Sequence, residues 1–434
     1  MNLKINFSRL FWGYGLCLFP LLLLVGPLIS ELYILTIIIF SLFYIISEKK
    51  FYFFNNKYIV FFVLFYLSTV FSTLFNFYHF DYSKSGILFF RLPLFAIAAW
   101  YVLKTYNIFD RKIVFFYTLF LSVIIIDSLI QFYLGKNILG YEILRNRISS
   151  FFGEELVLGG FITRIIPFFL MYLLMTNTIE ENKINFFYSL VISLSITIVY
   201  LSGERTSFFL LILFFFTIFI ISKYLRKLII LVMISFILSS FIISKFQKDD
   251  QLNASNRMFK KTYQQITGDG KNNEEHKKKF FNKVYAFSHD HHGHYLLSYK
   301  IFKDYPIFGT GVKGFRYLCR NKIYILEKND GCSTHPHNTY VQILVSNGIV
   351  GFTLIFLAFI YILREILKCR KKLSTKNTFD KYELSKGVML SAIFINLWPL
   401  IPSGNFFNNW ISMIYFYPIG FYLYFKHLNE TKIN

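Results

Sequence analysis

Two histidines stand where a long hydrophilic stretch of the chain runs into an apolar helix. The segment 332–342 reads CSTHPHNTYVQ, and apolar residues follow it without a spacer. Asn338 is of a type that caps free N–H groups at a helix start, which would place His335 and His337 at the boundary between water and membrane. An imidazole there could serve as a base near neutral pH. The alternative interpretation is a helix cap with incidental histidines.

Arginines form the second set of candidates, because a charge at membrane depth is costly and needs a reason. Arg205 lies in a connection of only a few residues between two apolar runs, so it is held close to the membrane surface. Glu204 could neutralise it as a local ion pair, which is the alternative to an arginine aimed into a cavity. Arg91, Arg147 and Arg164 also lie in or near apolar runs. Guanidinium groups stay charged and bind phosphate oxygens in pairs, so arginines and an imidazole that share one cavity would suit a diphosphate.

The long hydrophilic stretch also holds a histidine-rich segment and two cysteines. His289–His294 reads HDHHGH, but it lacks cysteines and a defined ligand spacing, so we expect no metal site there. Cys319 and Cys332 would lie on the oxidising side of the membrane, and a disulfide between them is therefore a hypothesis. The glycines at 309–311 are not part of a strand–turn–helix unit and do not form a nucleotide-binding fingerprint.

Composition identifies the framework that must position these residues. Of 434 residues, 55% are hydrophobic and only 16% are charged, and apolar runs recur at about the 20 residues that a bilayer requires. The pattern predicts an all-α polytopic membrane protein with about twelve spans. The predicted spans are approximately 10–29, 32–47, 58–77, 86–104, 113–134, 156–176, 186–202, 207–222, 228–245, 346–366, 386–402 and 409–426.

Lysines and arginines in the short connections predict the orientation. They concentrate after the even-numbered spans, which places both termini in the cytoplasm. The chain then divides into spans one to nine (1–245), a long extracytoplasmic loop with short helices (246–345) and three final spans (346–434). The net charge of +22 would suggest nucleic acid in a soluble protein. Here topology explains most of it, so we expect no nucleic acid partner.

The long loop has its own pattern of order and charge. It is basic although it is predicted to be extracytoplasmic, which loops longer than about 60 residues are free to be. An anionic partner would explain that charge, and anionic lipid head groups are the alternative. The polar residues 249–283 are expected to be partly irregular. By contrast, apolar residues in 294–304 recur at helical spacing, and Pro306 follows that helix.

Several short motifs, in a fixed order, give the chain a family resemblance. They are RISSFFG at 147–153, GERTS at 203–207, NR at 256–257, YPIFGTG at 305–311 and CSTHPHN at 332–338. Together with the long late loop, they resemble the O-antigen ligase and Wzy-type polymerase superfamily over about 147–366. One departure is clear. The family often carries a glutamate after the His-Asn pair, where this chain has Val345, Ser346 and Asn347.

The resemblance implies an activity and a location. The family has a GT-C-like helical architecture in the bacterial inner membrane, with an active site facing the periplasm. It transfers a glycan from an undecaprenyl-diphosphate carrier to an acceptor hydroxyl, without a cofactor or an obligatory metal. A ligase uses a sugar of lipid A–core as the acceptor, and a polymerase uses a second carrier-linked glycan. A transporter without chemistry is a further alternative, but the paired half-repeats with broken helices that it predicts are not evident.

The resemblance also implies roles for individual residues. His337 would be the base or would orient the acceptor, and His335 would shape the site. Arg205 and Arg147 would bind the diphosphate, with Arg257 as a third, and Arg205 would stabilise the charge that develops on the leaving group. Asn338 would cap the helix or hold the ring of His337. Attack opposite the carrier would invert the anomeric centre.

Overall fold

The computed structural model describes residues 7–75, 84–178, 186–245, 254–267, 286–324, 331–375 and 379–431. Within these ranges the regular structure is helical, and β-pairing is confined to two isolated bridges. Seven helices are long and apolar enough to cross a membrane, so the prediction of an all-α membrane protein is confirmed. They are α4 (Pro27–Ser47), α5 (Lys57–Phe75), Ser85–Tyr106 (which contains α7, Arg91–Tyr106), α8 (Arg111–Leu134), α9 (Leu158–Met175), α12 (Arg226–Lys245) and α16 (Thr339–Thr375).

Other described helices coincide with the remaining predicted spans. They are α10 (Phe186–Leu201), α11 (Arg205–Ile221), α17 (Lys381–Asn396), α18 (Asn409–Thr431) and, for the first span, the short pieces η1 (Arg9–Tyr14), α2 (Gly15–Cys17) and α3 (Phe19–Val25). The first span is broken where Pro20 enters α3 at its first turn. The total of twelve spans and the predicted orientation stay predictions.

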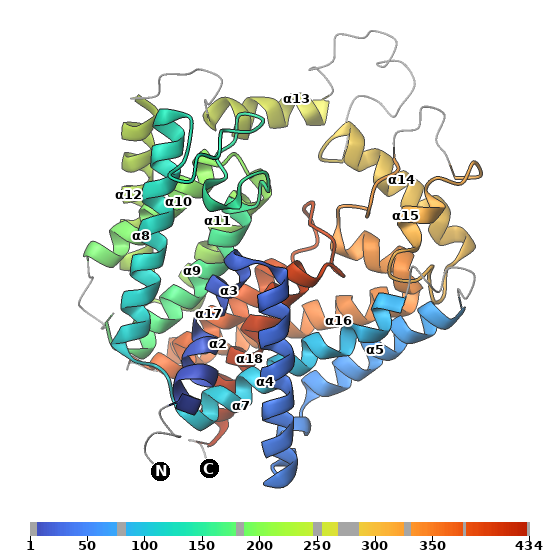
Figure 1. The fold of residues 1–434 in the computed structure, drawn as a ribbon, viewed down its shortest axis with the longest axis horizontal. Helices are drawn as coiled ribbons and strands as arrows, with labels where there is room; N and C mark the ends of the chain where they lie inside the picture. The colour runs from blue at the N-terminus through green and yellow to red at the C-terminus, as the bar shows by residue number, and fades with distance from the viewer. Residues whose placement is uncertain are drawn as a thin grey trace.

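The bundle is built around α7, α9, α17 and α18. Helix α18 packs against α7 and α17, and α17 packs in turn against α9 and α16. Gly420 allows α18 to approach α7 closely, because a Cβ atom there would lie 2.6 Å from the Cβ of Ala99 on α7. Close approach through small residues is the usual means of helix packing in a membrane. Helices α8, α10 and α12 lie on one side of this centre and α5 and α16 on the other (Figure 1).

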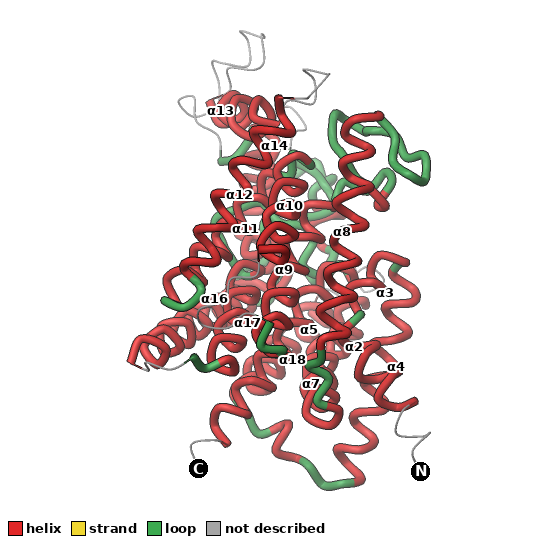
Figure 2. Tube along the Cα trace, turned by 90° about the vertical axis from the view of Figure 1, so that its left-hand side faces the viewer, coloured by secondary structure: helices red, strands yellow, loops and turns green. Residues whose placement is uncertain are grey.

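The described parts of the long loop are helical. They form η7 (Asn256–Lys260) with α13 (Lys261–Thr267), then α14 (His289–Asp304) and α15 (Gly314–Leu318). Part of the segment expected to be irregular is therefore ordered helix, and the rest of 249–283 lies outside the described residues. Helices α13 and α14 lie together at one end of the bundle, far from α4 and the end of α18 (Figures 1 and 2).

Helix α16 begins at Thr339, seven residues before the predicted span, and bends at Gly348, whose φ of 65° is open mainly to glycine. The bend frees backbone groups that cannot remain unpaired at membrane depth. The turn 306–311 satisfies them: Thr310 N donates to Val345 O (2.8 Å), and Ile349 N donates to Pro306 O (2.8 Å). The predicted boundary at 345 thus falls inside a helix. The turn 306–311 of the long loop is hydrogen-bonded to that helix at the bend.

The three residues that stand where the family often has a glutamate belong to this bend. Asn347 is fully buried, and its amide donates to Thr69 Oγ1 on α5 at 2.8 Å. The carbonyl of Ser346 accepts a hydrogen bond from Ser72 Oγ, also on α5. This position therefore fastens α16 to α5 in this chain.

Candidate active site

A cavity of about 500 Å³ lies between the bundle and the long loop. Its walls come from the starts of α9 and α11, from η7 and α13, from the histidine segment and from the connection between α17 and α18. All five site residues of cationic or imidazole type that the sequence predicted line it: Arg147, Arg205, Arg257, His335 and His337. The cavity also takes in Arg164, which the sequence offered as a candidate by its place in an apolar run, and Arg145 and Lys261, which it did not assign a role.

Local backbone geometry fixes the orientation of His337. Its φ of 57° is unusual for a residue with a side chain, and the surrounding hydrogen bonds hold it there. The His337 carbonyl accepts from Ser403 N at 2.8 Å, and the ring atom Nε2 lies 3.2 Å from Ser333 Oγ. Ser403 thus holds the backbone of His337 and Ser333 contacts its ring, which lines the cavity.

Asn338 is the cap of α16. Its Oδ1 accepts from Tyr340 N (3.0 Å) and Val341 N (3.1 Å), which satisfies free N–H groups of the first turn. Its Nδ2 donates to the carbonyls of Pro399 and Ile401, at 2.8 and 3.0 Å. The residue therefore ties the histidine segment to the opposite wall of the cavity, and these bonds do not involve the ring of His337.

Two further histidines stand behind His337. The ring centroid of His294 lies 5.2 Å from that of His337, the His291 centroid lies 5.7 Å from it, and the His335 centroid lies 4.0 Å from it. His291 and His294 are three residues apart and so share a face of α14. Their spacing was visible in the sequence, but the packing of α14 beside the 333–337 segment was not. Among the described residues, no group of His, Cys, Asp or Glu has a geometry suited to a metal ion.

Burial and this crowding keep His335 and His337 uncharged. Burial, and then the neighbouring imidazoles of His335, His294 and His291, lower the pKa of His337 to about 3. Burial likewise lowers the pKa of His335 to about 4. At neutral pH both rings are neutral, so each has one nitrogen able to accept a proton.

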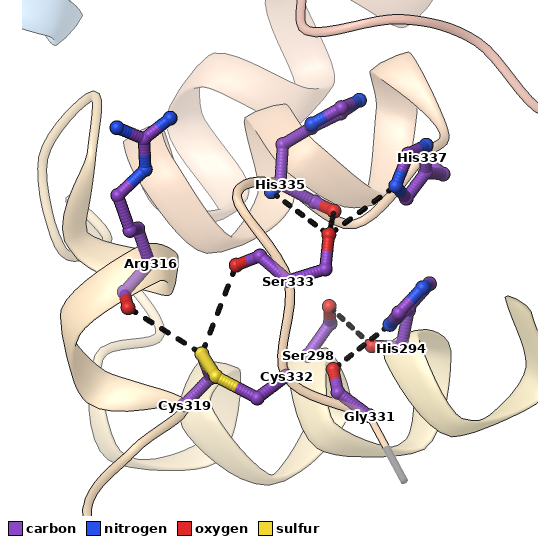
Figure 3. Close-up of a disulfide and its surroundings, with 9 residues drawn as sticks. All are labelled: His294, Ser298, Arg316, Cys319, Gly331, Cys332, Ser333, His335 and His337. Carbon is purple, nitrogen blue, oxygen red and sulfur yellow. Dashed lines mark hydrogen bonds between the residues drawn. A yellow bond between two sulfur atoms is a disulfide. The ribbon is translucent and has the colours of Figure 1, made fainter. Parts of the chain in front are cut away.

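A disulfide joins Cys319, which follows α15, to Cys332 at the start of the histidine segment (Figure 3). The next residue, Ser333, has the hydroxyl that contacts His337, and its carbonyl lies 3.8 Å from Cys319 Sγ. The disulfide therefore holds Cys332 in place, and the residue after it contacts His337, the candidate base.

The arginines reach the same cavity from other elements of the chain. Arg205 is the first residue of α11, and its guanidinium donates to Thr262 Oγ1 on α13 at 3.0 Å. Arg147 donates through Nε to Ser202 O at 3.2 Å. Arg257 lies over the turn at Gly203, where a Cβ atom would be 2.6 Å from Nη2. The turn, with φ of 68° at Gly203, therefore packs beneath Arg257 and also leads into Arg205.

Glu204 does not neutralise Arg205. Its carboxylate accepts from Gly159 N (2.7 Å) and Gly160 N (2.9 Å) at the start of α9, and from Ser207 Oγ (2.9 Å). The ion pair that the sequence left open is absent from the described residues, which include both partners. Glu204 instead fixes α11 to the positive end of α9, and burial raises the pKa of its carboxyl group.

The lining of the cavity carries an excess of positive charge, because its arginines and Lys261 are accompanied by a single carboxylate, that of Glu204. Burial, and then Arg147 and Arg205, lower the pKa of Arg257 to about 10. Burial also lowers the pKa of Arg147, against the opposing influence of Glu204. A bound anion would stabilise the charged form of a guanidinium whose pKa is lowered in this way.

A comparison with known protein families indicates which class of protein has such a cavity. The model of the family described as "O-Antigen ligase" matches residues 190–356. Residues 190–356 belong to the O-antigen ligase family. The resemblance drawn from the motifs is thereby confirmed, and the match, together with the apolar helices, supports a multi-pass membrane enzyme of the O-antigen ligase or polymerase type. No curated protein matches the chain.

The ligase-family region contains Arg205, Arg257 and His337, whereas Arg147 reaches the cavity from outside it. Two residues of α8 hold the loop that carries Arg147. Gln131 Oε1 accepts from Ser149 N and Ser150 N, both at 2.8 Å, and the fully buried Asp127 accepts from Ile138 N at 2.9 Å. An N-terminal part of the chain thus completes the cavity of the ligase-family region.

The remaining membrane-depth arginines separate into two cases. Arg164 lines the cavity and donates to Gly160 O at 2.9 Å. Arg91, at the start of α7, does not line it and instead pairs with Glu31 and Asn409 Oδ1. The interpretation of Arg91 as a member of the convergent set is therefore not supported by its position.

Proposed function

We propose that the protein transfers a glycan from undecaprenyl diphosphate to a sugar hydroxyl of lipid A–core, at the periplasmic face of the bacterial inner membrane. The single observation that carries this proposal is that Arg147, Arg205, Arg257 and His337 line one cavity. The guanidinium groups suit the diphosphate, and the neutral imidazole in the same lining can accept a proton from an acceptor hydroxyl. The family match supports the class of reaction.

The diphosphate is the leaving group in this reaction. When the bond between the anomeric carbon and the phosphate oxygen breaks, that oxygen gains negative charge. Arg205 and Arg147 are rigidly placed by their contacts with Thr262 and Ser202, so little reorganisation is needed to stabilise the charge. Arg257 adds a third guanidinium from the long loop.

His337 takes the proton of the acceptor hydroxyl as its oxygen attacks the anomeric carbon. In the free protein a pKa of about 3 makes the ring a weak base. A bound diphosphate places negative charge in the same cavity, which favours the imidazolium form and raises that pKa. Binding of the donor thus makes the His337 imidazole a stronger base. Attack from the side opposite the diphosphate inverts the configuration and needs no metal ion.

Alanine variants of His337 and Arg205 test the assignment with purified protein, a lipid-linked glycan donor and a lipid A–core acceptor. We expect transfer to fall by at least about 100-fold in each, because general-base and oxyanion-type contributions are of this order. His427→Ala and Arg370→Ala are matched controls outside the cavity lining. Near-normal product from either site variant would refute the roles.

The acceptor decides between ligase and polymerase, which share this chemistry. In a deletion strain, loss of all polymer attached to lipid A–core identifies the ligase that we propose. Attachment of single repeat units identifies a Wzy-type polymerase instead. Glycan that accumulates on the inner face with no transfer in vitro would indicate a transporter.

A further inference from the structure

A second cavity, apolar in character, adjoins the cationic one. It lies between α5, α16, α17 and α18, has a volume of about 140 Å³ and is partly open to the surroundings. Its walls are aromatic and aliphatic side chains, among them Phe61, Phe65, Ile355, Phe416 and Ile419. We call this space the apolar groove.

The apolar groove and the cationic cavity meet at Asn396 and Tyr415, which line both. Asn396 ends α17 and Tyr415 lies on α18, and only 8% and 6% of their surfaces are exposed. The buried Asn396 Oδ1 has no hydrogen-bond partner among the described residues. A buried amide oxygen without a partner is costly, so the junction has polar capacity that the protein itself does not use.

Polar groups along the groove are otherwise occupied. The Tyr58 hydroxyl donates to Pro93 O (3.2 Å), and Lys426 Nζ donates to the Tyr361 hydroxyl (3.2 Å) at the far end. What remains facing the space is therefore ring and hydrocarbon. From Tyr415 to Lys426 the groove follows α18 for eleven residues, or about 16 Å at the helical rise.

We propose that the apolar groove holds the isoprenoid chain of the lipid-linked donor while the diphosphate occupies the cationic cavity. The inference rests on the proposed function and adds where the carrier lies. A prenyl diphosphate is an apolar chain joined to an anion through one ester oxygen, and the two adjoining spaces match that division. The ester crosses at Asn396 and Tyr415.

The energetics specify what such a groove contributes. The chain arrives from the bilayer and not from water, so its burial gives little hydrophobic free energy. The groove contributes close packing against rings and, above all, a fixed entry angle for the diphosphate. Obstruction of the groove should therefore weaken donor binding and leave the chemical step nearly unchanged.

Ala358→Phe tests the groove because Ala358 is a small lining residue of α16. We expect the KM for a long-chain polyprenyl donor to rise at least tenfold, with kcat nearly unchanged. A donor with only two isoprene units should show the same KM as with the unmodified protein. Thr353→Phe is the matched control, since Thr353 lies exposed on the same helix outside the groove. Equal effects on both donors, or none on either in a folded variant, would overturn the proposal.

A photoreactive undecaprenyl diphosphate without glycan provides a readout that does not depend on catalysis. With a diazirine on the third isoprene unit, it should label peptides of the helices that line the groove (α5, α16, α17 and α18), even in the His337→Ala protein, and unlabelled undecaprenyl diphosphate should compete. Labelling confined to other helices, or displaced equally by phospholipid, would contradict the groove assignment. If groove labelling occurs but the unmodified protein transfers no glycan, the proposed function fails and the binding site stands.

Discussion

The imidazole of His294 packs beside that of His337, with ring centroids 5.2 Å and ring planes 29° apart. His294 Nδ1 donates to Gly331 O at 2.9 Å, since a carbonyl can only accept. The ring is therefore fixed in one tautomer by the residue that precedes Cys332. One side chain thus links α14, the disulfide and the candidate base.

The first prediction concerns pH. Because burial and the neighbouring imidazoles lower the pKa of His337 to about 3, its base form persists in the free enzyme as pH falls to about 4. The acidic limb of kcat/KM, which reports the free enzyme, should then lie lower than that of kcat, which reports the donor complex. The doubly esterified diphosphate stays ionised throughout and raises the pKa in that complex. Measurement of both profiles checks this.

His294→Gln sharpens this test, because glutamine can still donate to Gly331 O but does not titrate. Loss of a neighbour that lowers the pKa of His337 should move the acidic midpoint of kcat/KM upward. His427→Gln, far from the cluster in sequence and outside the cavity lining, should leave the profile unchanged. A midpoint near the ordinary histidine value of about 6.5 in the unmodified protein would contradict the prediction.

The second prediction concerns the turn beneath Arg257. In Gly203→Ala the new Cβ would lie 2.6 Å from Nη2, so the guanidinium must move away. We expect the KM for the donor to rise about tenfold, comparable to Arg257→Ala. The double variant should be no worse than Arg257→Ala alone, because the turn would act through that arginine. Additive losses in steady-state kinetics would show that the two positions act independently.

The third prediction concerns the disulfide. Cys319 and Cys332 are 13 residues apart, and closing a loop of this size stabilises a fold by about 3 kcal/mol in chain-entropy terms. Reductant should therefore lower the melting temperature and the activity of the unmodified protein. The double alanine variant is the control, since it should be less stable from the start and indifferent to reductant. If mass spectrometry of the purified protein finds both cysteines as free thiols, the disulfide is contradicted.

The fourth prediction concerns the bend of α16. At Gly348, φ is 65° and a Cβ atom would collide with Ile307 O, so Gly348→Ala should prevent the 306–311 turn from docking and destabilise the protein by more than about 3 kcal/mol. Gly135→Ala separates strain from collision. Its φ is 79°, but the space around it is open, so only about 1 kcal/mol is expected. Thermal unfolding in detergent compares the two, and similar losses would rule out the collision.

The helices followed from the sequence because a bilayer imposes a strong and local condition on composition. About 20 apolar residues must be consecutive, so most spans were found near their observed limits. The exceptions have local causes: Pro20 breaks the first span, and α16 starts early because Asn338 caps it. The bend at Gly348 was not predicted, since it depends on backbone partners from 306–311 that are distant in sequence.

Residue type alone determined which groups could do chemistry. A guanidinium binds phosphate and an imidazole accepts a proton wherever they stand, and the motif order tied Arg205, Arg257 and His337 to one family. Only the tertiary structure decided which of these residues lie together in the cavity. It brought His291 and His294 behind His337, turned Glu204 toward α9 and left Arg91 outside the cavity. Electrostatic coupling falls with distance in space and not along the chain, so the charge state of this cavity exists only in the folded protein.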